Sequence, residues 1–132
     1  MANEYESELR RQAFRERNRL QKLIKKTSPE RAQVLKPLCE NVGFLKARLD
    51  MAREELDGEP LVIEYQHGKD QSGTTENPAF RAYEGLFRSY VAGLAKILDA
   101  LPQAVSTAAF NAEPKQTQLA IIKARRTEAK SG

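Results

Sequence analysis

The sequence predicts a mainly α-helical chain built around an antiparallel helical hairpin, with helices over about residues 29–57 and 78–101. Two stretches repeat their apolar residues at alternating spacings of three and four. This spacing keeps one stripe of an α-helix facing a partner helix. The two stripes consist of Leu35, Leu38, Val42, Leu45, Leu49, Ala52 and Leu56, and of Phe80, Tyr83, Phe87, Tyr90, Leu94, Ile97 and Leu101.

Start and stop signals bound both helices. Ser28-Pro29 and Asn77-Pro78 each place a capping side chain before a proline at the first helical position, where proline loses no hydrogen bond. Gly58 follows the first helix and Pro102 follows the second, as expected at helix ends. Pro37 lies inside the first helix, where it removes a backbone hydrogen bond and predicts a kink or a break.

The hairpin divides the chain into three parts. The core covers 28–101 and includes a connector over 58–77, in which Leu61 to Tyr65 form a short β-type segment. The remainder of the connector reads as a polar, flexible loop. A basic N-terminal helix is expected over 1–27, and residues 102–132 form a basic C-terminal segment. Within that segment, residues 114–130 either form a short helix or fray.

Charge is segregated along the chain. Residues 1–26 carry eight basic and four acidic groups, whereas 27–101 carry nine basic and twelve acidic groups. Basic ends flanking an acidic middle favour contacts between the ends and polyanions. The alternative for the basic N-terminal stretch is a solvated helix face or a disordered tail. The candidate DNA-binding residues are Arg10, Arg11, Arg15, Arg17, Arg19, Lys22, Lys25 and Lys26.

Both hairpin helices carry more apolar surface than one partner helix hides. Phe44 and Met51 lie on a second face of the first helix, and Leu86 widens the stripe of the second. A homo-oligomer would bury these faces, although the N-terminal helix would also cover them within one chain. The candidate oligomerisation residues are Leu35, Leu38, Val42, Phe44, Leu45, Leu49, Met51, Leu56, Phe80, Tyr83, Leu86, Phe87, Tyr90, Leu94 and Ile97.

The sequence offers no recognisable catalytic or metal-binding constellation. The single histidine, His67, lies in the glycine-containing loop without a partner nucleophile, and the single cysteine, Cys39, has no second thiol. We therefore expect no enzyme activity, no cofactor and no metal. The apolar runs are too short for a membrane span, so no membrane partner and a cytoplasmic location are expected.

The order of features around the connector resembles the small subunits of tailed-phage DNA-packaging terminases. The resemblance consists of Leu61–Tyr65, the polar loop ending in Gln71-Ser72-Gly73, and the aromatic helix start from Glu76 to Phe87. It implies a non-catalytic protein that assembles into a ring, binds double-stranded phage DNA in the host cytoplasm, and presents it to the large terminase subunit, which is the ATPase and nuclease.

The N-terminal segment departs from one family feature, because 26 residues with a single helical pattern do not accommodate a complete helix-turn-helix. DNA binding through backbone phosphates is therefore expected. Another reading of the whole chain is a structural coiled-coil adaptor that joins protein partners without specific DNA binding. A small nuclease is a more distant alternative.

Overall fold

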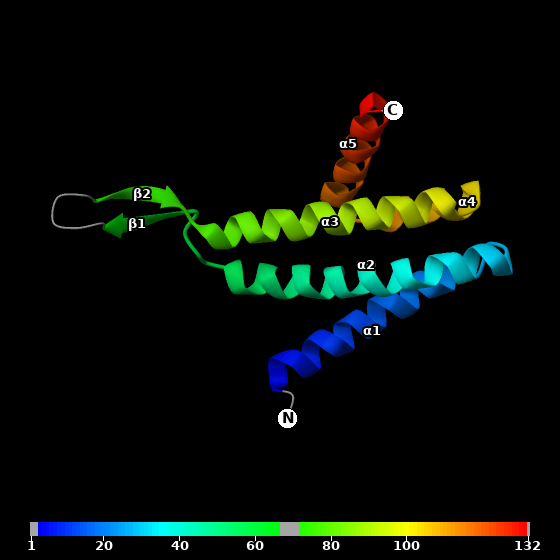
Figure 1. Cartoon of the computed structure of the whole chain (residues 1–132), viewed down its shortest axis with the longest axis horizontal. Helices are drawn as coiled ribbons and strands as arrows, with labels where there is room; N and C mark the ends of the chain where they lie inside the picture. Colours follow the sequence, from blue (N-terminus) through cyan, green and yellow to red (C-terminus); the bar gives the residue numbers. More distant parts are fainter. Residues whose placement is uncertain (1–2, 67–71, 132) are drawn as a thin grey trace.

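The structure, a computed structural model, describes residues 3–66 and 72–131. It is mainly helical, with one short antiparallel sheet. The elements are α1 (Glu4–Ile24), α2 (Pro29–Leu56), β1 (Val62–Gln66), β2 (Ser72–Glu76), α3 (Pro78–Ala100), α4 (Gln103–Ala112) and α5 (Lys115–Ser131). Helices α2 and α3 lie side by side and antiparallel, which confirms the helical hairpin (Figure 1).

The other helices pack on the outer sides of this hairpin. Helix α1 lies along α2, and α5 contacts α3, so that the two basic ends of the chain project in opposite directions in Figure 1. The hydrophobic core lies where these helices meet. Its fully or nearly fully buried members include Leu20, Ile24, Cys39, Val42, Leu49, Tyr90, Leu94, Ile97, Leu98 and Ile121.

The helix starts follow the predicted capping chemistry. The Ser28 hydroxyl accepts a hydrogen bond from the Arg31 amide at 3.2 Å, and the Asn77 side chain accepts one from the Ala79 amide at 3.1 Å. Gly58 adopts a φ of +82° just after α2, where a residue with a Cβ would be strained. These local signals fix the ends of the hairpin helices close to the predicted positions.

Of the kink or break predicted at Pro37, the break is absent, since α2 is one continuous helix of 28 residues. Proline removes one backbone hydrogen bond, but α2 is packed by α1 along one side and by α3 along another. Helices in proteins are stabilised mainly by such packing. Tertiary contacts therefore maintain the helix through a residue that would interrupt it in isolation.

The connector contains two strands, of which the sequence indicated one. β1 pairs antiparallel with β2 in a register that places Val62 opposite Glu76 and Tyr65 opposite Gly73. The expectation of a flexible loop was wrong for 72–76, where polar residues pair with β1 through their backbone; the loop tip 67–71, including His67, lies outside the described residues. Strands β1 and β2 form a β hairpin. The Asn77 side chain donates a hydrogen bond to the Pro60 carbonyl at 3.0 Å and closes the base of this β hairpin.

The C-terminal segment is helical as well. Helix α5 confirms the helical alternative for residues 114–130, and α4 was not predicted. Two features explain this omission: α4 is a single ten-residue helix without buried residues, and it has no side-chain cap at Pro102. In the part of the chain that the structure describes, no helix is both long and apolar enough to cross a membrane.

Candidate nucleic-acid interface

Helix α1 docks on α2 through one apolar stripe. Leu20 and Ile24 enter the main core, and Leu9 forms a second buried cluster with Ala47 and Met51. Gly43 makes this close approach possible: a Cβ at that position would lie 2.9 Å from the Ala13 carbonyl oxygen. The basic segment is therefore an ordered helix with a fixed inner face, and not a disordered tail.

The outward face of α1 carries the cations that are free to meet a polyanion. Arg11, Arg15 and Lys22 lie four and seven residues apart, a spacing that places them on one helix face opposite the buried stripe. The stretch from Arg11 to Lys22 spans about 17 Å at ~1.5 Å per residue, a length over which a DNA duplex carries about ten charges. Lys25 and Lys26 follow the last turn of α1 and are exposed.

Most of these cations are not neutralised within the chain. Arg11 pairs with Glu8 at 2.8 Å, but both side chains are largely exposed, so the pair contributes little. Within residues 3–66 and 72–131, Arg15, Lys22 and Lys26 form no ion pair. A phosphate backbone approaching α1 would therefore displace few internal contacts.

Two predicted DNA-binding residues point along the flank of α1 toward α2. Arg10 and Arg17 line a shallow hollow of about 340 Å³ together with Phe14 and Glu40. The Arg17 guanidinium lies 4.4 Å from the centre of the Phe14 ring, a cation–π contact. Its Nη2 also donates to the Asn18 side chain at 3.3 Å. These arginines are separated from the outward face that carries Arg11, Arg15 and Lys22.

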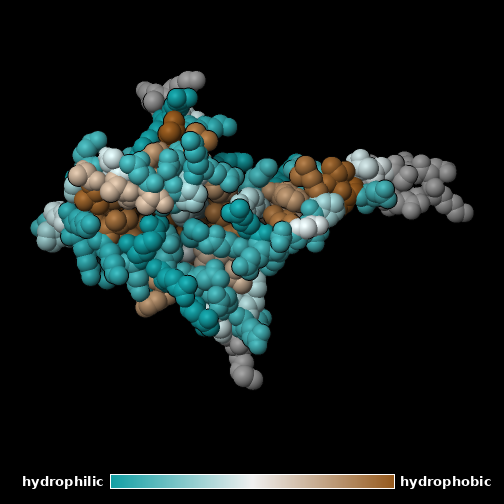
Figure 2. Space-filling view, turned by 180° about the vertical axis from the view of Figure 1, so that it is seen from behind, coloured by the Kyte–Doolittle hydropathy of each residue, from teal (hydrophilic) through white to brown (hydrophobic). Residues whose placement is uncertain are grey.

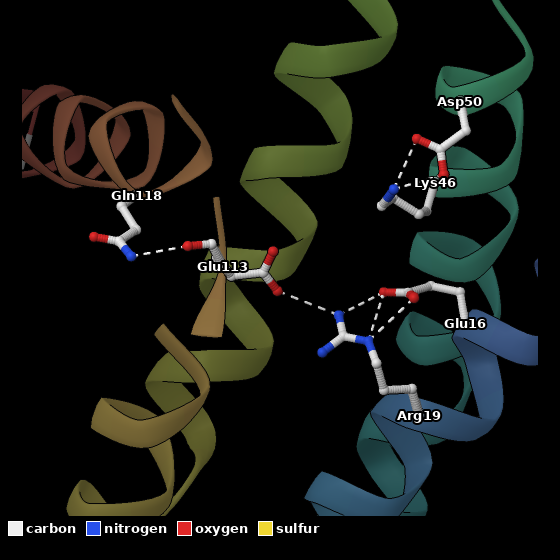
Figure 3. A network of polar contacts seen from close by, with 6 residues as sticks. All are labelled: Glu16, Arg19, Lys46, Asp50, Glu113 and Gln118. Carbon is white, nitrogen blue, oxygen red and sulfur yellow. Dashed lines mark hydrogen bonds and ion pairs between the residues drawn. The ribbon is translucent and has the colours of Figure 1, made fainter. Parts of the chain in front are cut away.

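Arg19 connects α1 to the segment between α4 and α5. Its Nε donates to both carboxylate oxygens of Glu16 at 3.1 Å, and its Nη2 lies 3.3 Å from the carboxylate of Glu113, between α4 and α5 (Figure 3). The hydrogen bonds that Arg19 donates to the Glu16 carboxylate raise the pKa of Arg19. Arg19 therefore ties α1 to the C-terminal helices and is less available to a ligand than its neighbours.

The groups around the Arg19–Glu113 ion pair are largely shielded from water. Burial raises the pKa of the Glu113 carboxyl, and this effect exceeds the opposing influence of Arg19. Burial also raises the pKa of the Tyr90 hydroxyl, with Glu113 adding to the effect. The Tyr90 hydroxyl is buried without a hydrogen-bond partner among the described residues. The Gln118 side chain donates to the Glu113 backbone carbonyl at 2.8 Å and holds this segment in place.

A second group of cations lies on α5, on the other side of the hairpin. Lys115, Lys123 and Arg126 are exposed, whereas Arg125 pairs with Asp99 at 2.8 Å. Because α1 and α5 project in opposite directions, one short duplex lying along α1 would not reach this group in a single copy (Figure 1). The two basic ends therefore form separate surfaces.

The candidate oligomerisation residues are distributed unevenly between core and surface. Val42, Leu49, Tyr90, Leu94 and Ile97 are buried within the chain. The residues that pack partly buried against this core are Leu35, Leu38, Leu45, Tyr83, Leu86 and Phe87. Leu56 and Phe80 are half-buried.

The second apolar face of α2 is only partly open. Met51 is 7% exposed because Leu9 of α1 covers it, so the expectation that this residue needs another subunit was wrong. The alternative, in which the N-terminal helix provides the cover, is confirmed there. Phe44 remains 44% exposed, with the Arg48 guanidinium 5.3 Å from its ring centre.

An open groove of about 700 Å³ runs between α3 and α5 and is lined partly by candidate oligomerisation residues. Tyr83 and Phe87 are stacked in it with ring centres 6.5 Å apart. In the described part of the chain, no three His, Cys, Asp or Glu side chains are grouped so that they would hold a metal. Cys39 is fully buried, and burial raises the pKa of its thiol.

Sequence reasoning missed Glu113 and Gly43 as residues that position the basic helix. A glutamate beside Pro114 reads as an ordinary polar turn, and its partner Arg19 is distant in sequence. Gly43 was detectable from the sequence, because a glycine inside a predicted helix often marks a place where another segment packs closely. It marks the place where α1 crosses α2.

Comparison with known proteins identifies no relative. No protein-family model matches the chain, no curated protein is significantly similar to it, and no solved structure matches it significantly. The resemblance to small terminases therefore depends on the sequence pattern alone.

Proposed function

We propose that the protein is a non-catalytic, DNA-binding assembly subunit of the small-terminase type. In this proposal, copies of the chain form a ring, bind double-stranded phage DNA in the host cytoplasm and present it to the large terminase subunit. The observation that carries the DNA-binding part is the outward face of α1, where Arg11, Arg15 and Lys22 are exposed on a helix anchored along its inner face.

The chemistry of this face favours backbone contacts over base reading. Lysines and arginines that bind phosphates release condensed counterions, which gives strong dependence on salt and little dependence on sequence. Base reading requires side chains placed in a groove, and α1 has its opposite face committed to α2. We therefore expect the isolated protein to bind unrelated duplexes with similar affinity.

The salt dependence of DNA affinity tests this part. We would measure binding to two unrelated 30-base-pair duplexes by fluorescence anisotropy over a KCl series. The test variant replaces Arg11, Arg15, Lys22 and Lys26 by glutamine. The control replaces four exposed cations outside α1, namely Lys36, Arg53, Arg88 and Lys96, and changes the net charge by the same amount.

The test variant should lower the slope of log affinity against log salt by about 3 to 4, at ~0.9 per lost phosphate contact. The control should change it by less than about 1. Equal slopes for the two variants would show that general charge, and not α1, binds DNA. Such a result would favour the alternative of a coiled-coil adaptor for protein partners.

A further inference from the structure

The outer face of α5 combines exposed apolar and basic side chains. Leu119 is 59% exposed and Ile122 is 37% exposed, although both belong to a helix whose other face buries Ile121 against the core. Lys115 and Arg126 lie four residues before Leu119 and four after Ile122, so they share this face. Lys123 adjoins it. No acidic residue occurs between Lys115 and Lys123.

The base of the β hairpin has the opposite charge and a similar apolar content. Leu61 is 60% exposed and Val62 is 52% exposed. Figure 2 shows an apolar area over the β hairpin, the element that contains Val62 and follows Leu61. The exposed acids around them are Glu54, Glu55, Asp57, Glu59, Glu64 and Glu76. In residues 53–66 and 72–81 the only basic residues are Arg53 and Arg81.

The β hairpin itself covers little of Leu61 and Val62. Strand β2 reads Ser-Gly-Thr-Thr-Glu and offers no large apolar side chain across from Val62 and Ile63. A two-stranded sheet alone is marginally stable in water. The two strands extend beyond the helices (Figure 1). Asp57 and Gly58, which precede the strands, line a hollow together with Gln116 at the start of α5.

We propose that copies of this chain join head to tail, with the acidic, apolar hairpin base of one copy packed on the basic, apolar outer face of α5 of the next. The charges select this pairing: two α5 faces would bring Lys123 and Arg126 against like charges, and two hairpin bases would do the same with Glu59 and Glu64. A contact between two different patches repeats from copy to copy and closes into a ring when the rotation allows. This inference rests on the assembly part of the proposed function and names its interface.

Charge reversal tests the pairing on the full-length chain. The α5 variant carries Lys123→Glu and Arg126→Glu, and the hairpin variant carries Glu59→Lys and Glu64→Lys. The combined variant carries all four substitutions. Molar mass would be measured by light scattering and sedimentation across a concentration series, with far-UV circular dichroism as the check on folding.

The wild-type chain should assemble, and each single-patch variant should assemble at least ten-fold more weakly. The combined variant should regain assembly, because the substituted positions of the two patches again carry opposite charges. Val34→Asp is the control, since Val34 is 77% exposed on α2, outside both patches, and should assemble as the wild type does. Leu119→Ser and Leu61→Ser remove apolar contact without changing charge and should each weaken assembly.

The outcomes separate the two proposals. A wild-type chain that is monomeric at every concentration contradicts both the assembly function and this interface. Wild-type assembly that is unaffected by the α5 and hairpin variants contradicts only the interface. A combined variant that is folded but as weak as its parents also overturns the pairing, because it shows that the charges act separately.

Discussion

The guanidinium of Arg19 lies 3.3 Å from the carboxylate of Glu113 and thereby joins the first helix to the segment between the last two. Glu16 holds the same guanidinium from the side of α1. The contact links two parts of the chain that are far apart in sequence, and it couples the position of the basic helix to that of α4 and α5.

Removing the Arg19 guanidinium should therefore destabilise the fold. Arg19→Met leaves two carboxylates close together in a largely desolvated place, and we expect a loss of about 1–2 kcal/mol in the free energy of unfolding. Arg11→Met is the matched control, because its pair with Glu8 is exposed and should be worth less than about 0.5 kcal/mol. Urea unfolding followed by circular dichroism measures both. Equal losses would show that Arg19 is only a surface charge.

Glu113 should make stability depend on pH. Burial raises its pKa in the folded protein above the ordinary value of 4.5, so the folded state favours the protonated carboxyl. The favourable contribution is complete below the ordinary pKa and is lost as pH rises through the raised pKa. Glu113→Gln removes this titration. The free energy of unfolding of the variant, relative to the wild type, should rise as the pH increases above about 4.5.

Unfolding curves at several pH values would check this expectation, and comparison with the wild type cancels the other carboxylates. A difference between the two proteins that stays constant with pH would show that Glu113 does not titrate differently on folding. Glu128→Gln provides a control at an exposed glutamate of α5.

The helical hairpin was predictable because local signals and periodicity agree there. The caps at Ser28 and Asn77 and the stop at Gly58 act within a few residues, so the sequence itself shows them. β2 was not predictable, since its stability comes from backbone pairing with β1 and not from its own side chains.

The basic site was predictable in composition but not in arrangement. The eight candidate cations form an obvious run, yet helix docking divides them into an outward face, a flank beside Phe14 and the tie at Arg19. That division depends on which side of α1 meets α2. It is fixed by the packing of Leu9 on Met51 and by the close approach of Ala13 to Gly43. Both contacts join α1 to α2 and are formed only in the folded chain.

Two helix glycines should respond oppositely to alanine. Gly43→Ala would place a Cβ 2.9 Å from the Ala13 carbonyl oxygen and 3.0 Å from the Arg17 amide nitrogen, both backbone atoms of α1. Overpacking of this kind costs ~1–3 kcal/mol, and the helix preference of alanine offsets only ~1 kcal/mol. Gly85→Ala meets nothing within 4 Å and should stabilise by ~0.5–1 kcal/mol. Thermal unfolding distinguishes the two; stabilisation by both would mean that α1 does not pack closely on Gly43.

Introducing glutamate at Met51 and at Phe44 separates cover within the chain from cover by another copy. Met51 is buried against Leu9, so Met51→Glu should place an unpaired charge in the contact between α1 and α2 and cost more than about 3 kcal/mol. Phe44→Glu changes an exposed side chain and should cost less than about 1 kcal/mol in the monomer. Urea unfolding at low protein concentration measures the monomer alone. Similar, small losses at both positions would show that α1 does not cover Met51 and would return that face to the interface between subunits.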